Sequence, residues 1–113
     1  MTKFRINPGN YRHRITIQEK IRTQNKYGEE INNWIDVIST RAGIYPISGK
    51  EFYAAEKVNS EVTHKIHMRF IPHVKIRSDM RIKFGERYFQ LAGPPINFQE
   101  KNVELQLLCK ELN

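Results

Sequence analysis

The sequence has one cysteine, no long apolar run and no apolar signal core near its N-terminus. Cys109 is the single cysteine in 113 residues, so no disulfide can form within the chain. It lies in the apolar stretch 103–109, which indicates a buried structural thiol, because reactive thiols need accessible, electropositive surroundings. No stretch approaches the roughly 20 apolar residues of a membrane-spanning helix. We therefore expect neither membrane association nor secretion through a signal peptide.

Residue patterns typical of catalysis and of cofactor binding are also missing. The glycines are too dispersed for a phosphate-binding loop, and no sharp turn presents a nucleophilic serine. His64 and His67 are three residues apart on an expected strand, so they face opposite sides, and no cysteine or carboxylate stands at ligand spacing. No zinc-finger, helix-turn-helix or RNA-binding signature is present. The sequence predicts a protein that is not an enzyme and has no catalytic residue, metal or cofactor.

The charge of the chain is the first informative feature that is present. A formal charge of +7 usually implies an anionic partner. Bases dominate between residues 62 and 87, where only Asp79 and Glu86 oppose them, and a smaller basic cluster spans residues 3–14. The bases of the larger region are Lys65, Arg69, Lys75, Arg77, Arg81, Lys83 and Arg87. They favour either a contact surface or a solvated strand face that only keeps the chain in solution.

Apolar and polar residues alternate with a period of two, the mark of half-buried β-strands. The apolar positions run from Tyr11 to Ile17, from Val62 to Phe70 and from Met80 to Phe84. Residues 84–87 predict a tight hairpin with Gly85 at positive φ, followed by a return strand up to Ala92. A further extended stretch covers residues 31–47 and contains Trp34, which we expect in the core.

Two segments depart from this alternation. Ser48 and Glu51 form a capping box, which predicts a short helix over 49–57. Residues 102–112 suit a strand or a helical face, and we favour a strand. The 39% hydrophobic content suffices for a core, and the length suits one domain over 1–113 with an N-terminal extension at 1–10.

These elements predict a mainly β fold, either a small β-barrel or a strongly bent antiparallel sheet, with one short helix and long polar loops. Residues 19–30 and 72–79 are the two expected exposed loops. Long polar loops on small barrels either bind partners or are disordered in the free monomer.

Several motifs together resemble the phage head-tail adaptor family, also described as head-tail joining, head-completion or stopper proteins. They are Arg12-His-Arg-Ile-Thr-Ile-Gln18, Tyr27-Gly28, Trp34-Ile-Asp-Val37, Ala42-Gly-Ile-Tyr-Pro-Ile-Ser-Gly-Lys-Glu51, Glu61 to Arg69, Met80 to Phe89 and Glu100 to Cys109. Each motif is weak alone, but their order and spacing are specific. The resemblance covers Tyr11 to Glu111, nearly the whole chain.

The resemblance implies a virion protein of a phage or prophage, made in the cytoplasm of the bacterial host and placed at the head-tail interface. Copies that are monomers when free would form a ring below the portal, complete the DNA-filled head, help retain DNA and offer a docking surface to the tail. The implied partners are a portal-side adaptor protein, a tail or tail-completion protein and further copies of the chain.

The candidate contact residues follow from charge and loop position. Lys26, Tyr27, Gly28 and Glu29 form the candidate inter-subunit loop. Lys65, Arg69, Lys75, Arg77 and Arg81 are the candidate contacts to a partner or to packaged double-stranded DNA, held without sequence readout. Acidic patches on the portal-side ring remain an alternative to DNA.

Two alternative functions stay open. A tail-completion component of the same joint would differ mainly in the ring that it contacts. A small basic nucleic-acid-binding barrel would bind free DNA tightly as an isolated monomer, with a strong salt dependence, whereas an adaptor would bind it weakly outside the ring.

Overall fold

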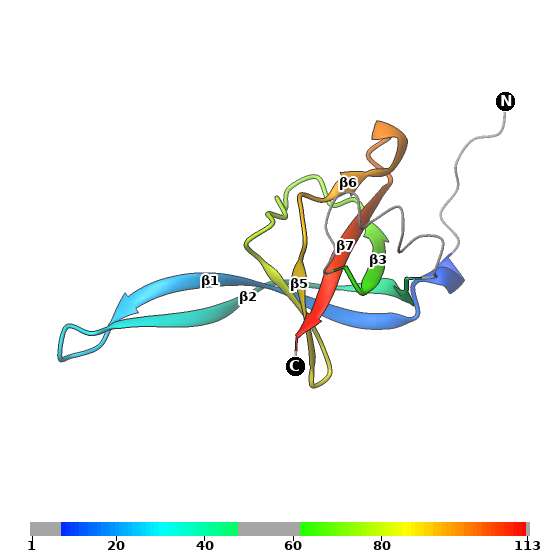
Figure 1. Ribbon diagram of the computed structural model, residues 1–113. Coiled ribbons are helices and arrows are strands. Elements are labelled where there is room, and N and C mark those ends of the chain that lie inside the picture. The colour runs from blue at the N-terminus through cyan, green and yellow to red at the C-terminus, as the bar shows by residue number, and fades with distance from the viewer. Residues whose placement is uncertain (1–7, 48–61, 113) are drawn as a thin grey trace, which may run out of the picture.

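The computed structural model describes residues 8–47 and 62–112, which form a sheet of seven strands and two 3-10 helices (Figure 1). The strands are β1 (His13–Gln24), β2 (Glu30–Pro46), β3 (His64–Arg69), β4 (Arg81–Phe84), β5 (Arg87–Leu91), β6 (Ile96–Asn97) and β7 (Glu104–Leu112). The helices are η1 (Pro8–Asn10) and η2 (Phe98–Glu100). Neither of these helical turns in the described ranges is long enough to cross a membrane.

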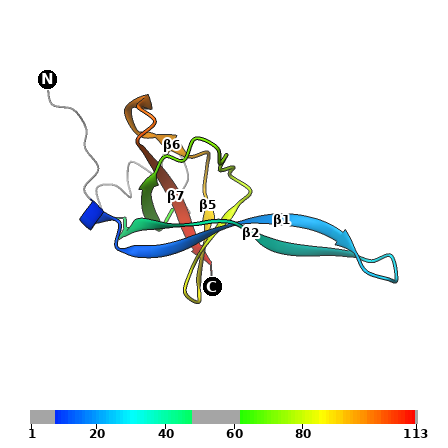
Figure 2. The ribbon, with the colours of Figure 1, turned by 180° about the vertical axis from the view of Figure 1, so that it is seen from behind.

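The sheet closes into an antiparallel barrel. Its order is β3-β2-β1-β4-β5-β7-β6, and β3 also pairs with β7, from His64 opposite Cys109 to Arg69 opposite Glu104. The two-residue β6 adds to the start of β7. Figures 1 and 2 show β3, β5 and β7 standing together, while β1 and β2 cross below them and run on beyond the barrel. The predicted mainly β barrel is confirmed.

The barrel interior contains the apolar residues of the period-two pattern. The largest fully buried side chains among the described residues are Ile15, Ile17, Ile66, Met68, Ile82, Phe89, Leu107 and Cys109. Alternation puts every second residue of a strand inside, because successive side chains point to opposite faces. Burial raises the pKa of the Cys109 thiol to about 12, so the thiol is a core side chain, as predicted.

Local predictions at the strand ends also hold. The β4–β5 hairpin turns at Gly85, whose φ is +60°, a backbone conformation that residues other than glycine rarely adopt. The C-terminal segment is a strand, and residues 72–79 join β3 to β4 outside any strand. The helix predicted over 49–57 lies outside the described residues.

The prediction of a loop over residues 19–30 is wrong for most of that range, because much of it is strand. β1 continues to Gln24, and its pairing with β2 extends from Glu19 opposite Ile35 to Gln24 opposite Glu30. Residues 19–35 therefore form a hairpin, here called the arm, which projects from the barrel (Figure 1) and accounts for the 61 Å length of the molecule. The backbone ladder forms although no side chain of residues 19–35 is fully buried, and the sequence of this segment lacks the apolar alternation of a half-buried strand.

A cluster of buried polar side chains lies on the outside of the barrel, next to Arg69 at the end of β3. Tyr11 is buried, yet it lies outside the core cluster, whereas the alternation places it on the inner face with Ile15. Its hydroxyl donates a hydrogen bond of 3.0 Å to Glu104, and His67 Nδ1 lies 2.8 Å from the other oxygen of that carboxylate. Burial, followed by the hydrogen bond to Glu104, raises the pKa of Tyr11 above its usual value.

Candidate interaction surfaces

One face of the arm carries three isoleucines among polar residues, and beyond Gln18 no other described strand pairs with the arm. Ile21 lies opposite Asn33, Thr23 opposite Ile31 and Glu19 opposite Ile35, so the three isoleucines share one side of the hairpin. Ile31 is 39% exposed and Ile35 is 43% exposed. Two-stranded hairpins are marginally stable by themselves, so apolar side chains on such a surface favour contact with another molecule.

The tip of the arm is a preformed turn that presents an aromatic ring. Asn25 Oδ1 accepts hydrogen bonds from the backbone N–H groups of Tyr27 and Glu29, at 2.9 and 3.0 Å. Gly28 has a φ of +82°, which permits the reversal. Tyr27 is 76% exposed, and the Lys26 ammonium lies 5.2 Å from its ring centroid. The residues of the predicted inter-subunit loop are therefore the outermost end of the arm.

Arg81 fastens the base of the arm to the barrel. Its guanidinium carbon lies 4.2 Å from the ring centroids of both Trp34 and Tyr88. Its Nε donates a 2.7 Å hydrogen bond to Gln18, which in turn donates one of 2.9 Å to Asp36. Cation–π contacts of this kind contribute roughly 0.5–2 kcal/mol each.

Trp34 is accordingly not a core residue. It is half-buried against Arg81 and absent from the core cluster, so the expectation that the tryptophan lies in the core is wrong. Its partner lies in β4, and the pairing could not be read from β2 alone. The guanidinium supplies the cover that an apolar core would otherwise give to the indole ring.

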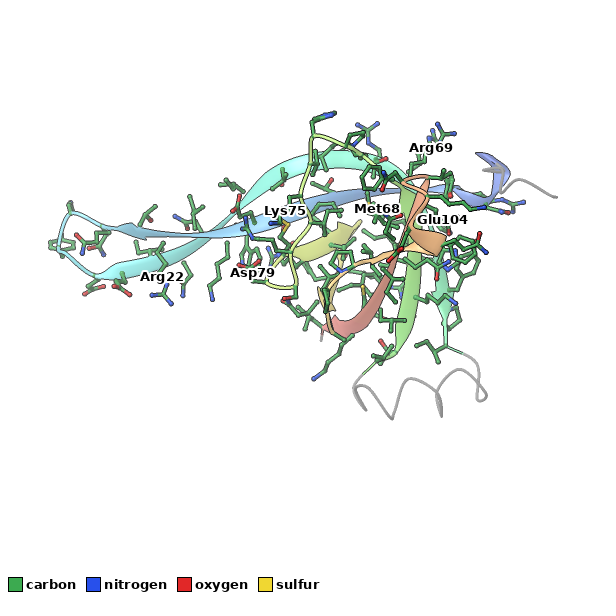
Figure 3. The ribbon with its side chains drawn as sticks, turned by 90° about the horizontal axis from the view of Figure 1, so that it is seen from above. Arg22, Met68, Arg69, Lys75, Asp79 and Glu104 are labelled. Carbon is green, nitrogen blue, oxygen red and sulfur yellow. The ribbon has the colours of Figure 1, made fainter. Side chains whose placement is uncertain are left out.

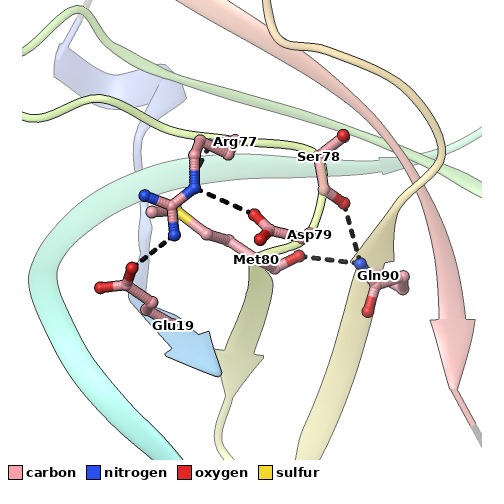
Figure 4. Close-up of polar contacts among 6 residues, drawn as sticks. All are labelled: Glu19, Arg77, Ser78, Asp79, Met80 and Gln90. Atoms are coloured by element: carbon pink, nitrogen blue, oxygen red, sulfur yellow. Dashed lines mark hydrogen bonds and ion pairs between the residues drawn. The ribbon is translucent and has the colours of Figure 1, made fainter. Parts of the chain in front are cut away.

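Arg77 holds the loop 72–79 against β1 (Figure 4). Its guanidinium forms ion pairs with Glu19 and, at 3.1 Å, with Asp79. The hydrogen bonds to Glu19 and then to Asp79 raise the pKa of Arg77 above its usual value. Across the loop, Gln90 Nε2 donates to the backbone oxygens of Ser78 and Met80, each at 3.0 Å. The loop is thus fastened to β1 on one side and to β5 on the other.

The predicted basic contact residues do not gather into one site. Arg77 and Arg81 are held by internal partners, and Arg69 is exposed but lies 5.9 Å from the ring centroid of Tyr11. Lys75 is exposed and Lys65 is half-buried. β3 carries Lys65 and Arg69, and it lies across the barrel from β4, which carries Arg81. Figure 3 shows Arg69 and Lys75 over different parts of the molecule. Their role as contacts stays a prediction.

Comparison with known proteins identifies the family. Residues 6–112 match the family described as phage head completion protein. The chain belongs to the phage head completion protein family. The resemblance predicted from the sequence motifs is thereby confirmed.

Individual relatives agree with this assignment. The chain is 24% identical over 83 residues to head completion protein gp16 of Bacillus phage SPP1, which covers 74% of each sequence. The solution structure of protein SF1141 from Shigella flexneri 2a has a TM-score of 0.71 and 27% identity, covering 94% of this chain and 96% of that one. A chain of the virion of a native gene transfer agent particle shares the fold, with a TM-score of 0.59, 17% identity and coverages of 90% and 96%.

Membership of this family gives the protein a structural role in the phage head and an association with other virion components. The geometry agrees with such a role, because the arm leaves apolar and aromatic side chains exposed to solvent. The arm offers an apolar face and an aromatic tip, while the barrel behind it is closed and packed.

Proposed function

We propose that the protein forms a homo-oligomeric ring at the head-tail joint, where it completes the DNA-filled head below the portal. The ring helps to retain the packaged DNA and provides the surface on which the tail docks. Its partners are a portal-side adaptor protein and a tail or tail-completion protein. The observation that carries this proposal is the arm, a preformed hairpin with an exposed apolar face on a closed barrel.

Ring formation needs a surface on each subunit that fits a different surface on the next. The arm offers such a surface, because it extends away from its own barrel (Figure 1). Ile21, Ile31 and Ile35 would pack on the adjacent subunit, and Tyr27 at the tip would insert as an anchor. Aromatic anchors of this kind dominate many interfaces.

The edges of the arm offer a second means of association. β4 pairs with β1 only at residues 16–18, and β3 pairs with β2 only at residues 42–46. Among the described residues, both outer edges of the arm therefore lack a neighbouring strand. A subunit in the ring could add its own backbone to such an edge, as in other cases of strand addition.

Negative-stain imaging of particles assembled with and without the protein tests this proposal. We expect particles that lack it to lose DNA and to carry no tails, and we expect the wild-type gene supplied in trans to restore both. Full heads that keep their DNA but lack tails would instead support a tail-completion component. Unaltered virions in the absence of the protein would reject a role at the joint.

A further inference from the structure

Three adjacent strands present an arginine at the same level of the outer barrel surface. Arg14 of β1 is directly opposite Arg41 of β2. Ala42 is opposite Met68 of β3, so the next position along this antiparallel pair sets Arg41 beside Arg69. All three side chains are exposed, because the residues next to them in sequence, Ile15, Ala42 and Met68, point into the core. We call Arg14, Arg41 and Arg69 the arginine row.

The arginine row does not contribute to folding through charge. Like charges directly opposite each other on neighbouring strands are destabilising. Within residues 8–47 and 62–112, no carboxylate forms an ion pair with any arginine of the row. Glu104 lies opposite Arg69 in the β3–β7 register, but its two oxygens are engaged by Tyr11 and His67. The row keeps its positive charge where folding alone would favour neutral side chains.

The neighbouring level of the surface is polar and basic. Thr16 lies opposite both Ser39 and Lys83, and its hydroxyl is 2.9 Å from that of Ser39. Lys83 is exposed. Protein interfaces are usually built around aromatic or aliphatic anchors with few charges at their centre, and these two levels bear no exposed aromatic or large aliphatic side chain. Arginine, lysine, serine and threonine are the side chains that commonly contact nucleic-acid phosphates.

We propose that the arginine row is a contact surface for the phosphates of double-stranded DNA. The proposal rests on the function proposed above, since packaged DNA is the polyanion at the joint. Guanidinium groups bind phosphate oxygens with two parallel hydrogen bonds, which makes arginine more specific for phosphate than lysine is. The contact carries no sequence readout, because a flat sheet surface does not enter a DNA groove.

The dimensions of the row suit a duplex. Adjacent strands are about 4.8 Å apart, so the row spans roughly 10 Å. A duplex carries about one phosphate charge per 1.7 Å of its axis, so several phosphates lie within that length. Single strands are usually bound through stacking on aromatic rings, and neither level of this surface bears an exposed aromatic side chain.

The row differs from the basic set that charge alone predicted. Arg77 and Arg81 neutralise or cover groups of their own chain, whereas Arg14 and Arg41 have no such partner among the described residues. Only Arg69 belongs to both sets. Register across β1, β2 and β3 therefore brings together three exposed cations that form no ion pair among the described residues, although Arg69 also lies 5.9 Å from the ring centroid of Tyr11.

The test is the salt dependence of DNA binding by the full chain and a triple variant, Arg14→Gln, Arg41→Gln and Arg69→Gln. The probe is a short random-sequence duplex, measured at low ionic strength so that weak binding is detectable. If each arginine meets one phosphate, the slope of log Kobs against log salt becomes shallower by about 2.7, which is 0.9 for each contact. The row variant should keep or raise its melting temperature, since cross-strand repulsion is removed.

The matched control is Lys20→Gln, Arg22→Gln and Lys26→Gln, which removes the same charge from the arm. It should keep the wild-type slope. An equal change in both variants would show a general effect of net charge and would overturn the proposal, as would an unchanged slope in the row variant. If the row variant loses binding to polyglutamate but keeps its DNA binding, the proposal is overturned in favour of an acidic protein partner.

Failure of the proposed function gives a different pattern. If the wild-type gene fails to restore DNA-filled, tailed particles, the role at the joint is rejected even where the row variant changes the DNA-binding slope. If wild-type protein restores particles while the slope is unaffected by the row variant, the joint role stands and the DNA contact is rejected.

Discussion

Strands β1 and β2 run through both the barrel and the arm, but their surroundings differ in the two regions. In the barrel, β1 and β2 each have a strand on their other side, and Ile15 and Ile17 are fully buried. In the arm, the same strands pair only with each other, and Ile31 and Ile35 are exposed to solvent. The difference indicates that the barrel contains the packed core of the fold, whereas the arm exposes the side chains that we propose as contact surface.

The base of the arm joins these two regions. A register shift between Ile17 and Gln18 marks the point where the hairpin leaves the barrel. Arg81 and Arg77 fasten the arm and the adjoining loop there, through Trp34 and Glu19. The basic residues of this chain therefore fall into two groups. Arg77 and Arg81 make contacts within the chain, whereas the arginine row is exposed to solvent.

The largest expected contrast comes from the same truncation made in each region. Ile66→Ala removes a fully buried side chain and should lower the free energy of unfolding by about 2–5 kcal/mol, because it leaves a cavity. Ile35→Ala in the arm should change it by less than about 0.5 kcal/mol. Urea unfolding followed by circular dichroism measures both. Equal losses would show that the arm contributes to the core stability.

The next contrast compares a buried polar pair with an exposed one. Glu104→Gln in the barrel should lower the free energy of unfolding by about 1–3 kcal/mol, because Tyr11 and His67 lose the charged acceptor that they share. Glu19→Gln at the base of the arm should leave the unfolding midpoint unchanged within error, because solvent screens its pair with Arg77. Thermal unfolding of both variants tests the contrast.

Sequence reasoning found the barrel more readily than the arm, for a physical reason. The burial of Ile66 and Met68 gives β3 the alternation that predicts a half-buried strand. Residues 19–24 contain one apolar side chain, Ile21, so their sequence lacks this alternation and predicts a loop. The backbone ladder nevertheless extends through them. The sequence also could not show which basic residues have partners within the chain. The contacts of Arg77 and Arg81, and the alignment of Arg14 with Arg41, depend on the register between distant segments.

Arg81 links the two regions, and its removal should separate their unfolding. In Arg81→Ala, Trp34 loses its cation–π contact, and the arm base should loosen at a lower urea concentration than the barrel. Trp34 is the single tryptophan of the chain, so its fluorescence reports on the arm base while circular dichroism reports on the whole sheet. The two transitions should coincide in the wild-type protein and separate in the variant. Coincident transitions in both proteins would contradict this role.

A smaller effect concerns acid stability of the barrel. Burial lowers the pKa of His64, so the folded state favours the neutral ring. The stabilisation is present above the unfolded pKa of about 6.5 and is lost as the pH falls through the lower folded value. We expect the melting temperature to fall modestly below about pH 6.5. His64→Gln should flatten that decline, and an unchanged pH profile would assign it to other groups.

Arg87 adds a second acid-sensitive contact at the same end of the barrel. It binds the Glu111 carboxylate through Nε at 2.7 Å and Nη2 at 2.9 Å, and this bond lowers the pKa of Glu111. Its stabilisation is present above the unfolded glutamate pKa of about 4.3 and disappears below it, a range separate from that of His64.

This division of roles, in which the arm serves assembly and the barrel serves folding, is our proposal. Its most direct test is the incorporation of Ile31→Asn/Ile35→Asn into particles that otherwise lack the protein, with Ile96→Asn/Leu112→Asn as the control at comparably exposed barrel positions. We predict that both variants keep a wild-type melting temperature, that the control restores tailed particles, and that the arm variant is absent from purified virions. Incorporation of the arm variant at wild-type levels would contradict the claim.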